Sequence, residues 1–431
     1  MRSRSPQSKG WLPGRSRLLL TLISSGALCA GRTAYAQVRD SLAGESAAEA
    51  LKKSMSAEDY NLRYGPVLLK TGASLGLNYT DNAFYSHTPK QDFMIDPEAT
   101  LDGLWQITEL NSLRLSLGLS YERYLENQIL NSDVPLVNPG SELAFNVFVG
   151  DFRIRLHERF SYQEDLFFNS LFGNDASFYN LNNVGIFARL DNQVGFDADW
   201  DLNKVVLSVG YNHEDFDTST APLEYLNRQS DWFTASASFD LGDKAKAGVE
   251  DQAGLHSYHH ETVLNDNWRN RAGPFVEVTL PQKITMRAGG GLDLARYVAT
   301  GFNNNDYTTY YGYARISQET RFFSHSLAAG REHLLGDLAN NLRTTYVRYS
   351  IDSPILRNLD LGANLSFNQG EEFGGAYDEK FTYYAAGLHV GYQFHKYWRA
   401  DLTYEFRRKE SNVPLLPFYR DVVSLTASYS F

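Results

Sequence analysis

The chain has 431 residues, a formal net charge of −11 and one cysteine. An acidic chain lacks the basic footprint of a nucleic-acid-binding protein, and one cysteine cannot build an intramolecular disulfide framework or a cysteine metal site. The 27 Tyr, 26 Phe and 33 Gly exclude a disordered chain and favour one large β structure over the two or three domains that the length would suggest.

Residues 1–36 have the pattern of a secretory signal peptide. A basic region is followed by a short apolar run at 18–29, and small residues at Ala34 and Ala36 precede Gln37. The apolar run is too short to cross a membrane as a helix. We therefore expect cleavage between Ala36 and Gln37. This cleavage would remove the cysteine, Cys29, which follows Leu28 rather than the small residue expected before a lipidated cysteine.

Residues 37–66 form a leader that contains the best helical pattern in the chain. Ala47, Leu51 and Met55 recur every four residues within it. We expect a periplasmic leader with a short helix. A plug inside a barrel is the alternative, although about 30 residues are too few for the folded plug of a large transporter.

Residues 67–431 are dominated by apolar–polar alternation, which indicates strands with two different faces. The segments 113–122, 233–240, 359–368 and 398–407 show this most clearly. One face carries Leu, Val, Ala, Phe and Tyr, and the other carries Gly, Ser, Thr and charges. The segments are also longer than the strands of a soluble sandwich. Both properties are typical of an outer-membrane β-barrel.

Eighteen such segments follow one another, and short turns alternate with longer connections. They cover approximately 67–79, 92–104, 112–124, 141–149, 152–163, 182–200, 204–214, 230–241, 246–259, 268–280, 283–297, 307–320, 324–335, 341–351, 358–369, 379–394, 397–408 and 418–431. We predict an all-β, antiparallel up-and-down transmembrane barrel of 18 strands, with 16 as the alternative. Both termini should be periplasmic, because the short turns lie on their side.

Several residues predict details of this barrel. Pro274 lies inside a strand and cannot donate a ladder hydrogen bond, so we expect a bulge or a register adjustment there. Aromatic residues near strand ends suggest belts at the two membrane interfaces. The belt candidates are Trp105, Trp200, Trp398, Trp232, Trp268, Tyr121, Tyr211, Tyr258 and Tyr404.

The final strand carries a separate signature. Val423, Leu425, Ala427, Tyr429 and Phe431 are apolar or aromatic at every second position, and the last is a terminal Phe. This ending resembles the assembly signal that the barrel-insertion machinery reads by strand addition. We expect the barrel-assembly machinery to be a partner.

The first hairpin suggests a family. Residues 76–86 read GLNYTDNAFYS and are followed by Asp92 and Pro97. This hairpin resembles the opening of the β-barrel porin type 2 family, in which an aromatic residue is followed closely by Asp-Asn and an aromatic loop. The resemblance implies a porin-like outer-membrane barrel. It also implies exopolysaccharide as a cargo and polysaccharide export components as partners, because relatives often accompany such export systems.

Charged residues on the polar faces are candidates for lining a pore, and their two signs are roughly balanced. They are Arg114, Glu122, Arg153, Arg155, Asp240, Glu277, Arg287, Asp293, Arg348, Asp360, Arg399, Asp401, Glu405, Arg407 and Arg420. Such a lumen favours polar over apolar solutes and shows no ring selective for one ion sign. The long loops are acidic and could bind divalent ions shared with lipopolysaccharide. Aromatic loop residues such as Phe84 and Tyr85 could stack on sugars or pack a loop into the pore.

The sequence therefore predicts a porin-like channel for polar solutes, with carbohydrate or exopolysaccharide as the favoured cargo. A structural or adhesion barrel with a loop-filled lumen is one alternative, and a membrane-embedded hydrolase is another. We expect no enzyme, because no nucleophile elbow, phosphate loop or zinc-helix motif occurs. We also expect no cofactor. His259 and His260 would point to opposite faces of a strand, so we expect no metal site there.

Overall fold

A computed structural model describes residues 60–108, 110–164, 187–242, 244–260, 263–298, 306–375 and 378–430. The predicted cleavage site, the leader helix and Phe431 lie outside these residues. The elements are β1 (Leu62–Tyr64), β2 (Val67–Thr80), β3 (Asp92–Gln106), β4 (Ser112–Ser120), β5 (Arg123–Tyr124), η2 (Gln128–Leu130), β6 (Leu136–Val137), β7 (Glu142–Val149), β8 (Phe152–Gln163), β9 (Arg189–Asp201), β10 (Val205–Asp217), η4 (Ala221–Leu226), β11 (Arg228–Asp240), β12 (Ala245–Tyr258), β13 (Asn267–Leu280), η5 (Pro281–Lys283), β14 (Ile284–Tyr297), β15 (Tyr307–Glu319), β16 (Ser324–Leu334), β17 (Ala339–Leu356), β18 (Leu359–Gly375), β19 (Glu379–His395), β20 (Trp398–Ser411) and β21 (Phe418–Ser430).

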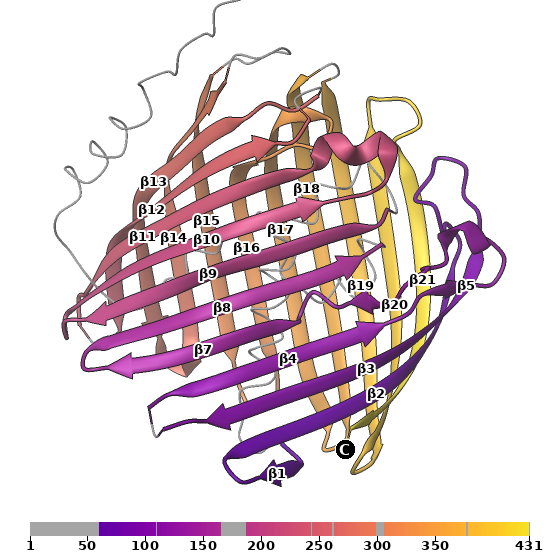
Figure 1. Ribbon diagram of the computed structural model, residues 1–431, viewed down its shortest axis with the longest axis horizontal. Coiled ribbons are helices and arrows are strands. Elements are labelled where there is room, and N and C mark those ends of the chain that lie inside the picture. Colours follow the sequence, from indigo (N-terminus) through magenta and orange to yellow (C-terminus); the bar gives the residue numbers. More distant parts are fainter. Residues whose placement is uncertain are drawn as a thin grey trace, which may run out of the picture.

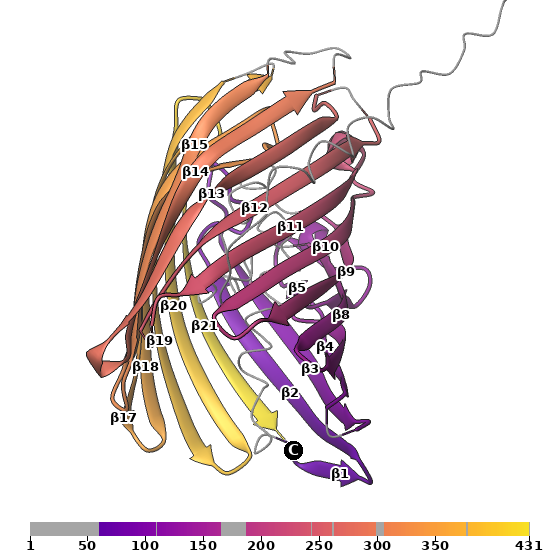
Figure 2. The ribbon, with the colours of Figure 1, turned by 90° about the vertical axis from the view of Figure 1, so that its left-hand side faces the viewer.

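The strands close into one barrel (Figures 1 and 2). Each wall strand pairs antiparallel with the next along the chain, and β21 closes the ring by pairing with β2 from Gly72↔Ser430 to Thr80↔Val422. Short β5 and β6 continue the lines of β4 and β7, so the wall has 18 strands. This confirms the predicted closed barrel of 18 strands. No helix of the described residues is long and apolar enough to cross a membrane.

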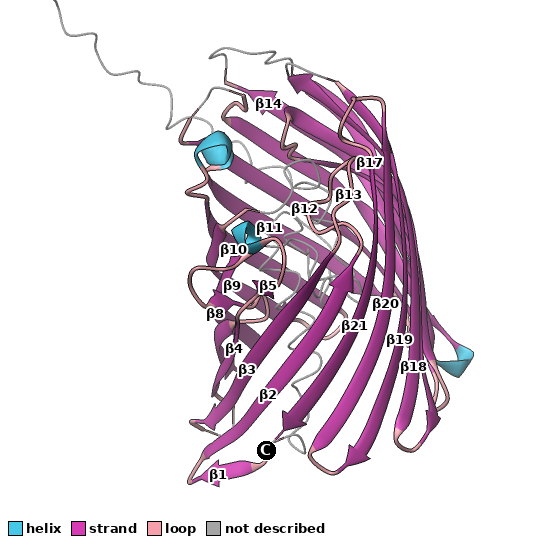
Figure 3. Ribbon diagram, turned by 90° about the vertical axis from the view of Figure 1, so that its right-hand side faces the viewer, coloured by secondary structure: helices cyan, strands magenta, loops and turns pink. Residues whose placement is uncertain are grey.

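The two ends of the barrel differ. Tight turns such as 150–151 and 396–397 join strands at the end that also carries β1 and the end of β21, which we call the turn end. The longer connections, with η2 and η4, lie at the opposite loop end, whereas η5 lies at the turn end (Figure 3). The last part of the predicted leader is not helical, because β1 folds back and pairs with β2 at Leu62↔Leu69.

The wall has an apolar outer face and a polar inner face. Residues paired across neighbouring strands point to the same side of a sheet, so the register assigns every wall residue to a face. Outward-facing Leu77, Val209, Leu365 and Leu388 are 50%, 51%, 57% and 57% exposed. Polar side chains are instead buried inside. This inverted arrangement is that of a barrel that spans a bilayer, where only closure satisfies every backbone hydrogen bond.

The predicted aromatic belts are confirmed in part. Trp105, Trp200 and Trp398 face outward at the turn end and are 45%, 39% and 43% exposed. The prediction that Trp232 and Tyr258 belong to the aromatic belts is wrong. Both face the lumen, and only 4% of Trp232 and 6% of Tyr258 is exposed. Trp232 lies opposite Gly254 and packs edge-on against His256, 4.7 Å between ring centroids. The Trp232 and Tyr258 side chains therefore pack inside the lumen and do not lie at a membrane interface.

The expected register change at Pro274 is absent. The β13–β14 pairs Ala272↔Leu292 and Phe275↔Gly289 stay in one register, and the ladder omits the two positions between them. Glycines make this possible, because a Cβ on Gly273 would lie 2.2 Å from the Gly290 carbonyl oxygen. The strands therefore accommodate the proline by close backbone approach and not by a bulge.

Candidate functional site in the barrel lumen

A row of mostly charged side chains runs obliquely along the inner wall. Direct cross-strand partners define it, and strand tilt carries it from the turn end at β11 to the loop end at β21. Its members in order are Asp240, Lys246, Glu277, Arg287, Arg315, Ala328, Arg348, Ser366, Ala385, Arg407 and Arg420. Basic residues outnumber acidic ones in it, so the row is a basic stripe on one side of the lumen.

Half-exposed ion clusters occupy the turn-end part of the lumen. Arg399 holds Asp360 through two contacts of 2.8 Å, and its Nε donates to Asp401 over the same distance. Arg153 similarly contacts Asp199 at 2.7 Å. Charges in this part thus pair with each other and still meet solvent, as in a wet vestibule.

A third cluster surrounds Arg287. Its guanidinium contacts Glu250 at 2.9 Å and Glu277 at 3.6 Å, and it lies 4.2 Å from the centre of the Phe275 ring. The Tyr313 hydroxyl donates to the same Glu250 carboxylate at 2.9 Å. The cluster fixes one arginine of the basic row between two carboxylates and two rings.

Ion pairs nearer the loop end are buried. Glu142 accepts from Arg155 at 2.5 Å and from Arg159 at 2.9 Å, and Lys409 contacts Glu379 at 2.9 Å. The Lys409 and Glu379 side chains are 0% and 1% exposed. Removing one partner of such a pair costs about 3–5 kcal/mol because the other charge stays buried. These pairs are part of the framework that narrows the lumen.

The remaining sequence candidates also lie inside the barrel, and most are buried. Glu405 pairs with Arg407 at 3.0 Å, and Asp293 contacts His333 at 3.3 Å. Arg420 donates to Thr80 at 3.0 Å and lies over the Tyr85 ring. The last three are Arg114 in β4, Glu122 between β4 and β5, and Arg348 over the Tyr346 ring at 4.5 Å.

Strand β3 places four carboxylates on its inner face: Asp92, Asp96, Glu98 and Asp102. Ser74 and Asn138 donate to Glu98, and Ser116 donates to Asp102. Asp92 accepts from the backbone N–H groups of residues 125–127. Neutral donors thus hold Asp92, Glu98 and Asp102, whereas Asp96 Oδ1 is buried without a hydrogen-bond partner among the described residues. The inner face of β3 is an acidic strip, separated by β2 from the end of the basic row on β21.

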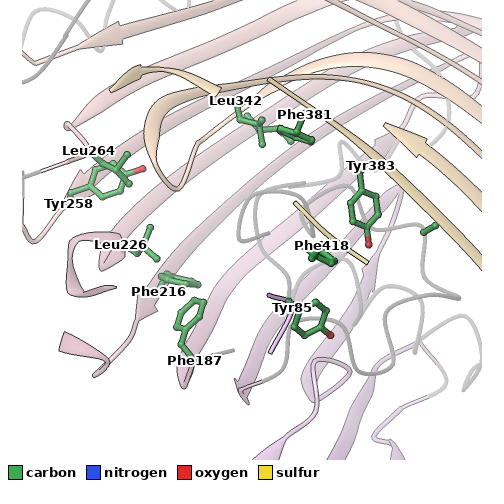
Figure 4. Packing of buried hydrophobic residues seen from close by; sticks show 12 residues of the cluster. Tyr85, Phe187, Phe216, Leu226, Tyr258, Leu264, Leu342, Phe381, Tyr383 and Phe418 are labelled. Atoms are coloured by element: carbon green, nitrogen blue, oxygen red, sulfur yellow. The ribbon is translucent and has the colours of Figure 1, made fainter. Parts of the chain in front are cut away.

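The loop end is narrowed by connections that fold inward. Their side chains pack against inward-facing wall residues in one apolar cluster (Figure 4). Leu226 from η4 and Leu264 from the β12–β13 connection are 0% exposed. Tyr85 from the β2–β3 connection meets Phe418 edge-on, 5.6 Å between ring centroids. The aromatic residues of this loop therefore pack a loop into the barrel.

One carboxylate holds the β16–β17 connection in this position. Glu372, in β18, accepts from the backbone N–H groups of Asp337, Leu338 and Ala339 at 2.5 to 2.8 Å. Tyr225, from η4, lies nearby. Burial raises the pKa of Tyr225, and the Asp337 and Glu372 carboxyls raise it further. We call this arrangement the Glu372 clamp.

Sequence reasoning missed several lumen residues, among them Glu142, Arg159, Glu250, Arg315 and Glu372. Arg159 could have been found, because it continues the spacing of Arg153 and Arg155. Glu372 had no such signal, because its partners lie 33 to 35 residues away.

No protein-family model and no curated protein sequence matches the chain. Among solved structures, it is similar to the Pseudomonas aeruginosa outer membrane protein OpdK, with 11% identity over 84% of this chain and 99% of that one, at a TM-score of 0.46. OccK2 of the same species, solved with glucuronate, gives 10% identity, coverages of 84% and 98%, and a TM-score of 0.48. A loop-deletion mutant of OmpT from Vibrio cholerae shows 12% identity over 85% of this chain and 100% of that one, at a TM-score of 0.40.

These similarities are too distant to transfer a substrate. The closed wall, the apolar outside and the polar inside define the chain on their own evidence. The chain is a closed, antiparallel 18-stranded β-barrel with the apolar outside and polar inside of a barrel that spans a membrane.

Proposed function

We propose that the barrel is a porin-like channel for polar solutes, with its loop end facing outward and both termini in the periplasm. The observation that supports this proposal is the charged row from Asp240 to Arg420, which offers polar contacts on one side of the lumen from the turn end to the loop end. A wide barrel with a polar interior can hold a water path. The buried cluster at the loop end makes this a narrow path.

Carbohydrate, including exopolysaccharide moving outward, is the cargo we favour. Hydroxyls of neutral sugars can hydrogen-bond to paired charges, and balanced pairs such as Arg399 with Asp360 do not select strongly for one ion sign. The direction of transport and a polysaccharide export partner follow from the family resemblance. The pattern that ends β21 supports recognition by the barrel-assembly machinery.

Channel activity is tested with purified barrel in planar bilayers and in liposomes that contain graded sugars. We expect stepwise conductance and swelling that falls as the sugar grows. A folded barrel that gives no current and no swelling would contradict the proposal.

A barrel with a permanently filled lumen is the second candidate, because the apolar cluster crosses the loop end. Deleting residues 221–226 separates the two. A channel should gain conductance over an already measurable current. A structural barrel should conduct only after the deletion.

We also propose that the protein is not an enzyme. A membrane-embedded hydrolase would cleave phospholipid or peptide substrates and would lose this activity on substitution of a single Ser or His. Incubation with both substrate classes should give no product.

A further inference from the structure

A charged hollow lies on the outside of the barrel near the loop end, across β16 to β20. Strands β17, β18 and β19 have 18, 17 and 17 residues, whereas about 9–11 tilted residues cross a bilayer. Their loop-end portions therefore extend beyond the hydrocarbon layer. The hollow has a volume of about 550 Å³, and Arg331, Arg343 and Lys380 are among its lining residues.

The hollow begins where the apolar outer face ends. Val347, Phe367 and Tyr384 face outward on β17, β18 and β19 just on the turn-end side of the hollow, and they are 43%, 40% and 38% exposed. The Phe367 and Tyr384 rings lie 5.4 Å apart. The next outward positions on the three strands are Thr345, Gln369 and Thr382, and the charged residues follow. Apolar chains and a polar group could thus be bound one above the other.

The hollow and its rim are net basic. Arg331, Arg343, Lys380 and Arg408 face outward here together with two acids, Glu371 and Glu410. Arg343 and Lys380 both pair with Glu371, and Arg408 pairs with Glu410, so the surplus is two positive charges. The Lys380 and Arg408 side chains are 70% and 56% exposed.

Arg331 is held in place from one side. It donates to the Tyr310 hydroxyl at 2.9 Å and lies 4.3 Å from the centre of that ring. A terminal nitrogen of the same guanidinium also lies 3.5 Å from the Thr309 hydroxyl. A guanidinium carries five N–H donors, so the terminal nitrogens of Arg331, which lines the hollow, keep donor capacity for a ligand.

The outer face of β10 and β11 shows the opposite charge at the same end. There His213 lies between Asp215 at 3.6 Å and Asp231 at 2.8 Å. The basic hollow is thus a local feature of one side of an acidic protein.

We propose that this hollow binds the phosphate groups of an outer-leaflet glycolipid, the lipid A part of lipopolysaccharide. Arginine and lysine donate charge-assisted hydrogen bonds to phosphate oxygens. The acyl chains of the same lipid lie against Val347 and Phe367 below. Free phosphate would lack these apolar contacts. The inference rests on the proposed orientation, which puts the hollow at the outer leaflet.

The test uses the full barrel in nanodiscs of neutral phospholipid that contain bisphosphorylated lipid A. Native mass spectrometry measures how much lipid A stays bound. The double variant Arg331→Gln, Lys380→Gln should bind lipid A at least tenfold more weakly, because two charge-assisted contacts to phosphate oxygens are lost. The matched control is Arg123→Gln, which removes an exposed outward arginine beside Ile95 on another part of the wall and should bind like wild type.

Three results would overturn the proposal. The double variant could retain lipid A as wild type does, dephosphorylated lipid A could bind equally well, or inorganic phosphate alone could displace the lipid. Conductance is measured on the same samples. Lipid A binding without any current would contradict the channel and leave the lipid site standing, and a current without lipid A binding would do the reverse.

Discussion

Most single residues in this barrel are explained by the face on which they lie, and Glu158 is one of the exceptions. It faces outward on β8, opposite Leu143 and Val194, which are 42% and 46% exposed to the membrane side. A carboxylate in a lipid-facing band is unfavourable, although less so than Arg or Lys at the bilayer midplane, where the cost is about 2–4 kcal/mol. Glu158 therefore lowers the stability of the isolated barrel.

Glu158→Leu should raise the free energy of unfolding by about 1 kcal/mol, because it removes a charge from the apolar band. Guanidinium unfolding of the lipid-embedded barrel measures this change. Glu410→Leu is the control, since Glu410 lies on the outer face above the apolar residues and should change stability little. A destabilised Glu158→Leu barrel would mean that a polar partner meets this residue in the membrane.

Some residue placements could be predicted from the sequence and were not. Trp232 has the same parity as Ser230 and Thr234, which lie on the polar face of an alternating segment. Parity alone therefore places it inside. The aromatic-belt rule favoured the outside because Trp232 stands near a strand end, and there burial by inward-folded loops competes with the interface. Where the two signals disagree in this barrel, parity is correct.

At the scale of elements, the β16–β17 connection shows what a sequence does not reveal. The predicted strands 324–335 and 341–351 leave a short connection between them, but its inward course depends on Glu372 in another strand. No local pattern encodes a partner so far along the chain. The strands themselves were predictable because alternation is a local property.

Glu372→Ala should loosen this connection, because three backbone N–H groups lose their acceptor, at a cost of about 1–3 kcal/mol for a buried unsatisfied group. We expect a larger and noisier conductance in planar bilayers and faster amide exchange at residues 337–339. Glu371→Ala is the matched control, since the neighbouring residue faces the outside. An unchanged current and unchanged exchange would show that the clamp does not hold the connection.

The β13–β14 contact offers a second test of an element. Gly273→Ala would place a Cβ 2.2 Å from a backbone oxygen, so the strands must separate, and overpacking of this kind costs about 1–3 kcal/mol. Gly312→Ala is the control, because its nearest neighbour would lie at 3.8 Å. In guanidinium unfolding, the midpoint of Gly273→Ala should fall below that of the wild type, and the midpoint of Gly312→Ala should stay close to it. Equal unfolding midpoints for the two variants would contradict the close approach of the β13 and β14 backbones.

For the whole molecule, the sequence predicted a closed 18-stranded barrel but not how its charges are distributed. Counting charges on polar faces gave balanced signs, because a count ignores which strands are neighbours. Register separates them in space. Arg315, Arg348 and Arg407 belong to one basic row, whereas the inner face of β3 carries acids. Register depends on turn lengths and long-range closure, which single segments do not contain.

This separation should give the channel a measurable ion preference. Replacing Arg315 and Arg348 by Gln removes two positive charges from the middle of the basic row and should shift the reversal potential in a KCl gradient towards cation permeation. The shift should shrink at high salt, because the screening length falls from about 10 Å at 0.1 M to about 3 Å at 1 M. Arg331→Gln, on the outer face, should leave the reversal potential unchanged. An equal shift in both proteins, or a shift that does not depend on salt, would mean that the row does not face the path of the ions.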